Sequence, residues 1–227
     1  MAVVTSSNFA KANWSESGNS LPLPLDSRLN LVALVGPNGS GKSTFFRRFL
    51  AKWNLPFVNP DEIAKQLGLA DPTQAAFRAF REATKRRNQL LADGRSFVTE
   101  GIRPDPGFLK EAAAKGWFTR VLFVCTNAPA INIDRVAYRV EHGGHHVDPK
   151  AVEARYYRSL ESLPEAAAIA SQLILFDNTA RSQPHRFIAR FQSGGLVSLR
   201  RNPPAWAIGV FAKEFEAFRA AASSSQP

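Results

Sequence analysis

The sequence of 227 residues has one cysteine, so neither an internal disulfide nor a cysteine-rich zinc site can form. It has no apolar run near the ~18 residues that a membrane-spanning helix needs. Its first residues lack the basic stretch and the apolar block of a secretory signal. These absences predict a cytoplasmic protein that has neither a membrane-spanning segment nor a membrane partner.

Acidic residues are also scarce, because 19 Asp and Glu oppose 29 Lys and Arg and leave a net charge of +10. Such a charge attracts polyanions, which include nucleic acids, membrane surfaces and nucleotide phosphates. The net charge alone does not indicate which of these polyanions the protein binds. Hydrophobic residues make up 44% of the chain and charged residues 21%, which allows a core to form and excludes a fully disordered chain.

Apolar segments of strand length alternate with segments that have helical patterns. Asp-Pro pairs at 71–72, 105–106 and 148–149 are typical helix starts. This alternation predicts an α/β fold in which helices cover a five-stranded parallel sheet, followed by a hairpin over 186–200 and a last helix over 207–221. The five predicted strands are 29–36, 55–60, 95–101, 119–127 and 172–178.

The two ends of the chain differ from this pattern. Residues 1–28 are rich in Ser and Asn and end in an alternating proline stretch, so we expect a flexible tail there. A second short tail is expected at 222–227. The domain between them, residues 29–221, contains an arginine-rich segment over about 129–162 that is predicted to be a lid.

The segment GPNGSGKST directly follows the first predicted strand and matches the phosphate-loop pattern G-x-x-x-x-G-K-[ST]. Glycines let backbone N–H groups point at a phosphate, and the following helix adds its positive N-terminal end. Lys42 would reach the β- and γ-phosphates, and the Ser43 hydroxyl would coordinate Mg²⁺. The pattern predicts binding of ATP with Mg²⁺, and the alternative is a glycine-rich turn. The predicted ATP-binding residues are Gly36, Asn38, Gly39, Ser40, Gly41, Lys42, Ser43 and Thr44.

Several classes of phosphate-loop protein are excluded by what the sequence lacks. There is no LSGGQ-like signature of transport ATPases and no N-K-x-D guanine motif of GTPases. There is also no run of four apolar residues closed by Asp-Glu, as in ATP-driven motors. The small-kinase type remains, which combines a phosphate loop, a second-substrate pocket and an arginine-rich lid.

The carboxyl ends of parallel strands meet at one edge of a sheet, and ligands bind there. Asp61 follows the second predicted strand and could be the general base for an acceptor hydroxyl, although acids at helix starts are common. Glu100 closes the third strand and could bind the acceptor, or it could be an exposed strand-end acid. Arg103 could hold a substrate phosphate or be a solvated loop arginine.

Arginines of the predicted lid lie on two helix faces that are joined by a glycine bend at 143–144. Arg135 and Arg139 are four residues apart, and Arg155 and Arg158 are three apart on the next helix. Two such faces suit a lid that closes over a transferred phosphate and stabilises its charge. The alternative is a pair of ordinary amphipathic surface helices.

The ordered set of GPNGSGKST, NPDEIA, VTEG, RVAYRVEHGGHHV, RYYRSL and LILFDN resembles the zeta toxin family, in particular its small chromosomal branch. The resemblance spans about residues 29–180. It implies an adenylate-kinase-like P-loop NTPase fold and an enzyme that uses ATP and Mg²⁺ to phosphorylate the 3′-hydroxyl of the amino sugar in UDP-N-acetylglucosamine. It also implies a small antitoxin protein as a partner.

The resemblance also implies roles for single residues. Lys42 and Ser43 would be the phosphate and Mg²⁺ ligands, Asp61 the general base, and Arg139 the first lid arginine. A second lid arginine precedes a Thr-Pro pair in the plasmid toxins, but this chain has His-His-Val-Asp-Pro there, so Arg155 or a histidine would take that role. Branch members commonly have Glu-Thr-Thr where this chain has Glu-Gly-Ile. The predicted substrate contacts are Glu100, Arg103 and Arg135.

Two other functions stay open. A polynucleotide 5′-kinase or a nucleic-acid-linked ATPase fits the positive charge and the same loop. The sequence lacks a recognisable nucleic-acid-binding module and an aromatic stacking pattern, so a nucleic-acid partner is not expected. A non-catalytic nucleotide-binding switch would require that Asp61 has no role in chemistry.

Overall fold

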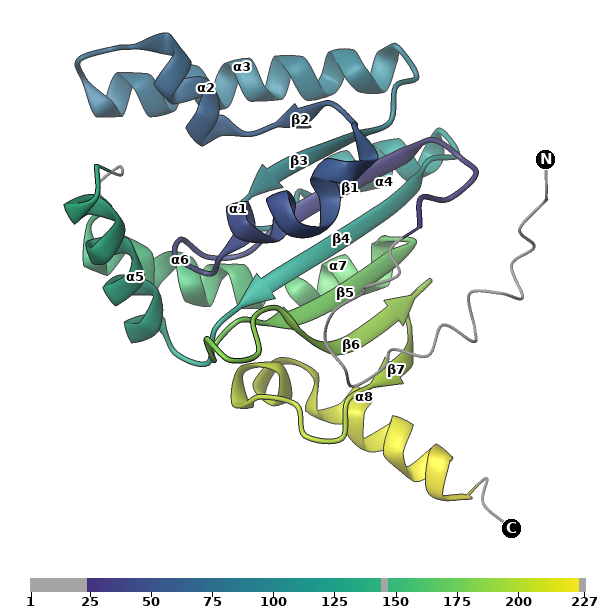
Figure 1. The fold of residues 1–227 in the computed structure, drawn as a ribbon. Helices are drawn as coiled ribbons and strands as arrows, with labels where there is room; N and C mark the ends of the chain where they lie inside the picture. The colour runs from purple at the N-terminus through teal and green to yellow at the C-terminus, as the bar shows by residue number, and fades with distance from the viewer. Residues whose placement is uncertain (1–23, 144–146, 225–227) are drawn as a thin grey trace.

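A computed structural model describes residues 24–143 and 147–224. Seven strands form one sheet in the order β2-β3-β1-β4-β5-β6-β7 (Figure 1). Neighbouring strands from β2 to β5 are parallel, whereas β6 pairs antiparallel with both β5 and β7. The strands are β1 Asn30–Val35, β2 Phe57–Val58, β3 Phe97–Gly101, β4 Phe118–Cys125, β5 Gln172–Asp177, β6 Arg186–Gln192 and β7 Gly195–Leu199.

The α/β class and the five parallel strands are confirmed, but the predicted strand count was wrong. The hairpin expected over 186–200 forms as β6 and β7 and extends the same sheet, because β6 pairs with β5 along its length. Leu173 faces Phe191 in this pairing, and both are fully or almost fully buried. The hairpin is therefore part of the core sheet and not an appendage to it.

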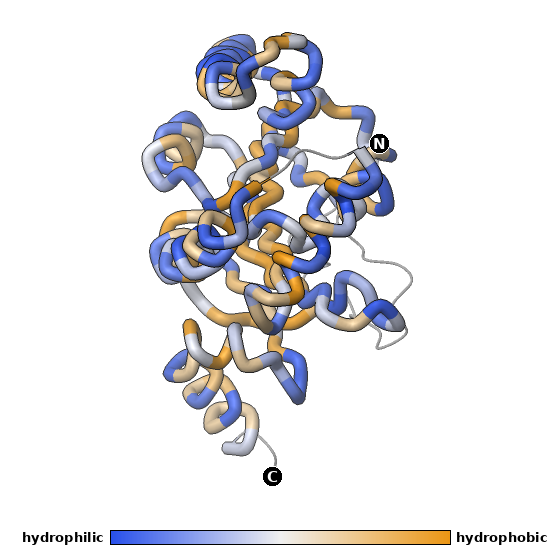
Figure 2. Tube along the Cα trace, turned by 90° about the vertical axis from the view of Figure 1, so that its left-hand side faces the viewer, coloured by the Kyte–Doolittle hydropathy of each residue, from blue (hydrophilic) through white to orange (hydrophobic). Residues whose placement is uncertain are grey.

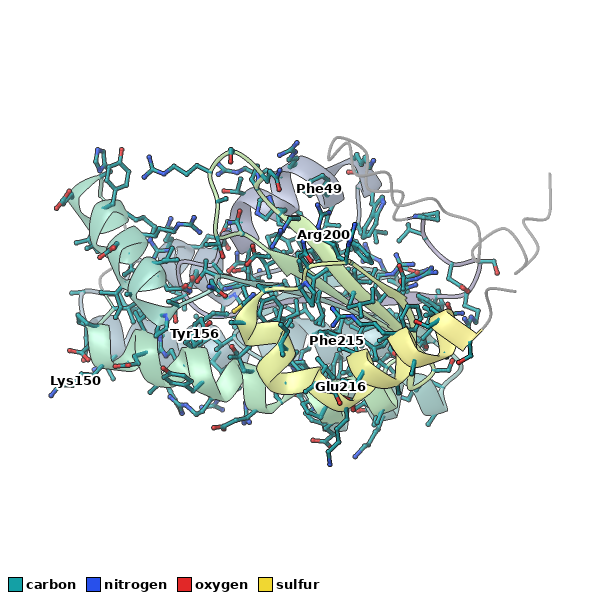
Figure 3. The ribbon with its side chains drawn as sticks, turned by 90° about the horizontal axis from the view of Figure 1, so that it is seen from below. Phe49, Lys150, Tyr156, Arg200, Phe215 and Glu216 are labelled. Carbon is teal, nitrogen blue, oxygen red and sulfur yellow. The ribbon has the colours of Figure 1, made fainter. Side chains whose placement is uncertain are left out.

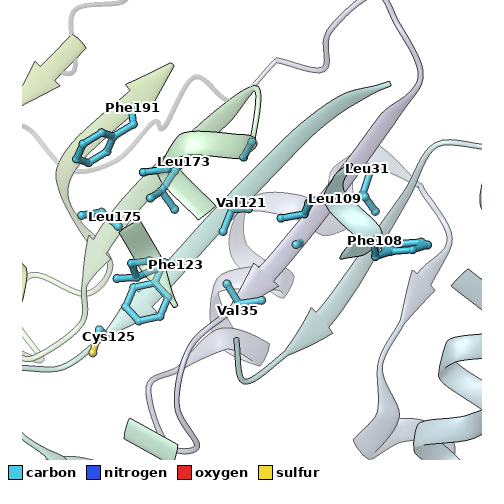
Figure 4. Packing of buried hydrophobic residues seen from close by; sticks show 14 of the residues in the cluster. Leu31, Val35, Phe108, Leu109, Val121, Phe123, Cys125, Leu173, Leu175 and Phe191 are labelled. Carbon is cyan, nitrogen blue, oxygen red and sulfur yellow. The ribbon is translucent and has the colours of Figure 1, made fainter. Parts of the chain in front are cut away.

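Helices cover both faces of the sheet. On one face, a large apolar cluster joins β1, β4 and β5 to α4, α7 and α8; Figure 4 shows Leu31, Val121 and Leu173 within it. On the other face, a smaller cluster joins the sheet to α1 and the turns that follow it. In Figure 2, hydrophobic residues are concentrated in the middle of the molecule, and most hydrophilic residues lie toward its outside. The helices are α1 Lys42–Phe45, α2 Pro60–Leu67, α3 Pro72–Ala92, α4 Pro106–Ala114, α5 Pro129–Glu141, α6 Pro149–Glu161, α7 Leu163–Ile169 and α8 Ala205–Ser224.

The predicted helix starts are confirmed in detail. Asp71, Asp105 and Asp148 each cap a helix with a side-chain oxygen that accepts from backbone N–H groups of the first turn, and a proline occupies that turn. Asn59 caps α2 in the same way. Helix α7 was not predicted, because it follows α6 after a single residue, Ser162, whose backbone is itself helical.

The segment expected as one helix from Lys42 to Trp53 changes its geometry along its length. After α1, a π-helical turn spans Phe46–Leu50 and a 3-10 turn spans Ala51–Trp53. Phe45 packs at ring-centroid distances of 4.8 Å from both Phe49 and Phe176. This aromatic packing fixes the first turn against β5.

The last helix also departs from expectation. It begins at Ala205, two residues earlier than predicted, and has a kink at Phe211, whose φ of −125° and ψ of 32° are not helical. Phe211 and Phe215 are buried against the sheet. Figure 3 shows Phe215 on the sheet side of α8 and Glu216 on the opposite side.

The described part of the predicted N-terminal tail contacts the domain. Arg120 is fully buried in β4, and its Nη2 donates a hydrogen bond of 3.0 Å to the carbonyl of Pro24. Asp26 donates its backbone N–H to Asn30 Oδ1 at 3.0 Å. No helix among the described residues is long and apolar enough to cross a membrane.

Candidate functional site

The phosphate loop (residues 36–44) connects the carboxyl end of β1 to α1, at the edge where the arrowheads of β3 and β4 point in Figure 1. Gly39 and Gly41 have φ angles of 75° and 98°, which favour glycine. A Cβ at Gly39 would collide with the backbone of Asn132, and one at Gly41 would collide with the side chain of Asn178. Both glycines are therefore required by conformation and by space.

Lys42 lies inside this loop and is only 8% exposed. Its Nζ donates hydrogen bonds to the carbonyls of Gly36 and Pro37 at 2.8 and 3.2 Å, and it lies 3.8 Å from Glu100 Oε1. Burial lowers the pKa of Lys42, while the negative charges of Glu100 and Asp61 oppose that shift. The lysine thus places its amino group inside the phosphate loop, beside Glu100 at the carboxyl end of β3.

Glu100 is the penultimate residue of β3, and its side chain is 8% exposed. Its Oε2 accepts a hydrogen bond of 3.1 Å from Asn59 Nδ2. Burial raises the pKa of Glu100, and the Lys42 charge acts in the opposite direction. This carboxyl group can accept a hydrogen bond when ionised and can donate one when protonated.

Asp61 lies in the first turn of α2 and is exposed. The Asn59 side chain accepts hydrogen bonds from the backbone N–H groups of Asp61 and Glu62 at 2.8 and 3.4 Å, which fixes the start of the helix. The charge of Asp61 acts on the pKa values of both Lys42 and Glu100. The structure therefore places this acid on the same rim as the phosphate loop.

Ser43 and Thr44 form the exposed side of the first turn of α1. Among the described residues, no group of three or more His, Cys, Asp or Glu side chains could hold a metal ion. Mg²⁺ that accompanies a nucleotide needs only one or two protein oxygens, since phosphates and water complete its octahedron. The exposed Ser43 hydroxyl beside Lys42 fits that need.

The predicted lid arginines differ in the groups that they interact with. Arg139 of α5 is exposed, and its charge acts on the pKa values of Lys42 and Glu100. Arg155 of α6 donates from Nη1 to Asn38 Oδ1 at 3.1 Å. Arg135 instead donates to the carbonyl of Thr179 at 3.1 Å, in the connection between β5 and β6.

Arg103 lies exposed in the connection between β3 and α4. Its side chain forms no hydrogen bond or ion pair with the part of the chain that the structure describes. Gly144, His145 and His146, in the predicted glycine bend, lie outside the described residues.

Sequence reasoning missed two side chains that touch the loop. Asn132 is fully buried and donates from Nδ2 to the Asn38 carbonyl at 2.5 Å. His185 is 3% exposed, and its Nε2 lies 3.2 Å from the Gly41 carbonyl. The two partner pairs are 94 and 144 residues apart in the sequence, and no local pattern marks either contact.

Comparison with known proteins identifies the domain type. The AAA_33 family model, described as an AAA domain, matches residues 31–154, which is more than half of the chain. An uncharacterized protein of Haemophilus influenzae is 29% identical over 128 residues, which cover 55% of this chain and 91% of that protein.

Solved structures show the same fold. The AvrRxo1-ORF1:AvrRxo1-ORF2 complex with sulphate ions matches with a TM-score of 0.60 and 14% identity, covering 76% of this chain and 61% of that chain. The PezAT chromosomal toxin-antitoxin system of Streptococcus pneumoniae matches with a TM-score of 0.57 and 14% identity, covering 87% of this chain and 86% of that chain. The AvrRxo1 complex with ATP has a TM-score of 0.59 at 15% identity, covering 85% of this chain and 63% of that chain. At these identities the likeness establishes the fold alone.

Proposed function

Because the chain belongs to the AAA_33 family of AAA domains and carries a P-loop kinase-like domain, we propose that it is an ATP-dependent phosphotransferase. The observation that carries this proposal is the cluster of Lys42, Glu100 and Asp61. A buried lysine in the phosphate loop lies 3.8 Å from one carboxylate, and the charge of a second, exposed carboxylate acts on both. The ATP named in one of the matched AvrRxo1 structures also supports a nucleotide at this position.

The proposed reaction transfers the γ-phosphate of ATP to an alcohol. The acceptor oxygen attacks the γ-phosphorus, the bond from that phosphorus to the β,γ-bridging oxygen breaks, and ADP leaves. Asp61 takes the proton of the acceptor hydroxyl. Lys42, with Arg139 and Arg155 from the lid helices, stabilises the negative charge on the transferred group.

Both the metal ion and the phosphate loop would bind the triphosphate. We assign the Ser43 hydroxyl as the protein ligand of Mg²⁺, which neutralises charge on the β- and γ-phosphates when it is bound. Backbone N–H groups of the loop that donate no hydrogen bond within the described residues, among them those of Gly39, Gly41 and Lys42, would hold the remaining phosphate oxygens. The whole domain, residues 29–221, is proposed as the catalytic unit, with residues 129–162 as its lid.

The proposed acceptor is a nucleotide sugar, UDP-N-acetylglucosamine. The resemblance to zeta toxins supports this choice, and so does the shared fold with the toxin-antitoxin system PezAT. Glu100 would bind an acceptor hydroxyl beside Asp61, and Arg103 would bind the diphosphate from its exposed loop. A small antitoxin protein is the corresponding proposed partner.

A second candidate acceptor is the 5′-hydroxyl of a polynucleotide. The observation in its favour is the outer face of α3, where Phe77 and Phe80 are 62% and 63% exposed. Bases stack on exposed aromatic rings, and neighbouring cations bind the phosphates between them. The same face has a shallow hollow lined by Phe80, Arg81, Thr84, Lys85, Asn88 and Gln89.

A transfer assay separates the two acceptors. Radiolabelled ATP is offered with UDP-N-acetylglucosamine and, separately, with a 5′-hydroxyl oligonucleotide. We expect the label on the nucleotide sugar. Label on the oligonucleotide alone would replace the first acceptor with the second, and label on neither would reject both.

The role of Asp61 is tested by Asp61→Asn in the same assay. The amide cannot take the acceptor proton, so we expect transfer to be lost while ATP still binds. Glu62→Gln, one residue further in the same exposed turn, is the matched control and should keep its activity. Full turnover by Asp61→Asn would reject Asp61 as the general base.

A further inference from the structure

The phosphate loop is held from outside by three side chains that the proposed chemistry does not use. We propose that Asn132, Asn178 and His185 are positioning residues, which fix the peptide planes of the loop so that its N–H groups face the bound anion. This inference rests on the proposed nucleotide site. It concerns the binding step alone and does not depend on the acceptor.

Each of the three side chains approaches a different carbonyl of the loop. Asn132 Nδ2 donates to the carbonyl of Asn38 at 2.5 Å, and Asn178 Nδ2 donates to the carbonyl of Ser40 at 2.7 Å. His185 Nε2 lies 3.2 Å from the carbonyl of Gly41. Because a carbonyl can only accept, Nε2 is the protonated nitrogen of the neutral ring.

A carbonyl that is held in place fixes the N–H group of the next residue. In a planar trans peptide, the C=O of one residue and the N–H of the following residue point in opposite directions. Carbonyls held outward at 38, 40 and 41 therefore turn the amides of Gly39, Gly41 and Lys42 inward. Among the described residues, none of these three amides donates a hydrogen bond. Unpaired amides that converge in this way form an anion site.

The three side chains come from both sides of the loop. Asn132 belongs to the first turn of α5 and also bonds to the Thr126 hydroxyl. Asn178 follows β5, and its Oδ1 accepts the backbone N–H of His185 at 3.2 Å, so these two residues support each other. The loop is thus clamped between the start of the lid and the connection between β5 and β6.

The surroundings of His185 make it a rigid donor. Its ring meets Phe45 and Phe49 edge to face, with centroid distances of 5.2 and 5.9 Å. Its Nδ1 is buried without a hydrogen-bond partner in the described part of the chain. Burial lowers the pKa of His185 to about 4, which keeps the ring neutral and its charge away from the anion site.

The test measures the affinity for ATP and for inorganic tripolyphosphate by titration calorimetry, with no acceptor present. His185→Phe keeps an aromatic ring and removes its N–H donor. Asn178→Leu keeps a side chain of similar size and removes the amide N–H donor. One lost hydrogen bond corresponds to about tenfold in affinity. We expect each folded variant to bind both ligands about tenfold more weakly than the wild type. The thermal midpoint should stay close to that of the wild type in His185→Phe and fall in Asn178→Leu, which also removes the acceptor of the His185 backbone N–H.

Two controls separate positioning from general damage. His185→Gln keeps an N–H donor and should recover most of the affinity, and Asn202→Leu, which removes an exposed amide between β7 and α8, should leave the affinity unchanged. Wild-type affinity in folded His185→Phe and Asn178→Leu would overturn the proposal. If those variants fail to fold, nitrogen-15 NMR of the wild-type His185 ring decides, since a ring without a proton on Nε2 at pH 7 also overturns it.

The outcome is distinguishable from failure of the proposed function. A wild-type protein that binds tripolyphosphate but labels no acceptor would reject the transferase while the positioning test proceeds. A protein that transfers phosphate, and whose folded variants bind ATP and tripolyphosphate with wild-type affinity, would reject the positioning roles alone.

Discussion

Lys42 is held by two loop carbonyls and lies near Glu100, in a place from which water is almost excluded. Removing its ammonium group takes away the charge that would stabilise the transferred phosphate. We expect Lys42→Ala to lower the rate of phosphate transfer by at least ~10²-fold. Steady-state transfer kinetics check this, with Lys65→Ala at the far end of α2 as the control. A near-normal rate would show that the lysine is not at the reacting phosphate.

His185 makes stability depend on pH. Its pKa is lowered from 6.5 to about 4, chiefly by burial, with Arg48 and Arg135 acting in the same direction. Between these values the unfolded chain binds a proton that the folded chain does not, so stability is full above pH 6.5 and falls as the pH drops toward 4. The slope is about 1.4 kcal/mol per pH unit.

Urea denaturation of the wild type and of His185→Gln measures this contribution. From pH 7 to pH 5, we expect the wild type to lose about 2 kcal/mol more stability than the variant. If the wild type and His185→Gln lost equal amounts of stability from pH 7 to pH 5, the pKa of His185 would be the same in the folded and unfolded states.

At the scale of elements, the start of α2 links folding to the site. Asn59 caps the helix and also holds Glu100. We expect Asn59→Ala to lower the free energy of unfolding by about 1 kcal/mol through the lost cap. Asn59→Ser keeps a side-chain oxygen that can cap the helix and removes the amide donor to Glu100 without adding a charge, so it should keep most of the stability and still impair transfer. Denaturant melts and transfer rates of both variants check this, and equal stability losses would contradict the division of roles.

The elements also show what could be predicted from the sequence. Local signals were sufficient for the phosphate loop, the three Asp-Pro helix starts and the five parallel strands. The alternating pattern of RFIARFQ is the same whether a strand pairs only within its hairpin or also with β5, so the seven-stranded sheet could not be foreseen. The contacts of Asn132 and His185 depend on tertiary packing, because their partners are far away in the sequence.

At the scale of the whole molecule, the last helix belongs to the folding unit. Phe215 of α8 is 2% exposed, and its ring centroid lies 6.0 Å from that of Phe211. Phe215→Ala leaves a cavity against the sheet, for which a loss of about 3–5 kcal/mol is typical. We expect one cooperative unfolding transition at a lower temperature. Far-ultraviolet circular dichroism and tryptophan fluorescence should report the same midpoint.

The matched control for this prediction is Phe80→Ala on the exposed face of α3. It should leave the unfolding temperature nearly unchanged. An early, separate transition in Phe215→Ala would contradict the prediction, because it would mean that α8 unfolds independently of the sheet.

The hydrogen bond from Arg155 to Asn38 connects α6, the second helix of the proposed lid, directly to the loop that would receive the triphosphate. A ligand that draws the guanidinium away alters the equilibrium of the loop, and a ligand that reorders the loop alters the orientation of α6. Thermodynamic reciprocity makes these two effects equal in size. Nucleotide binding and lid closure would then be coupled directly through the Arg155 side chain, with no other residue between them.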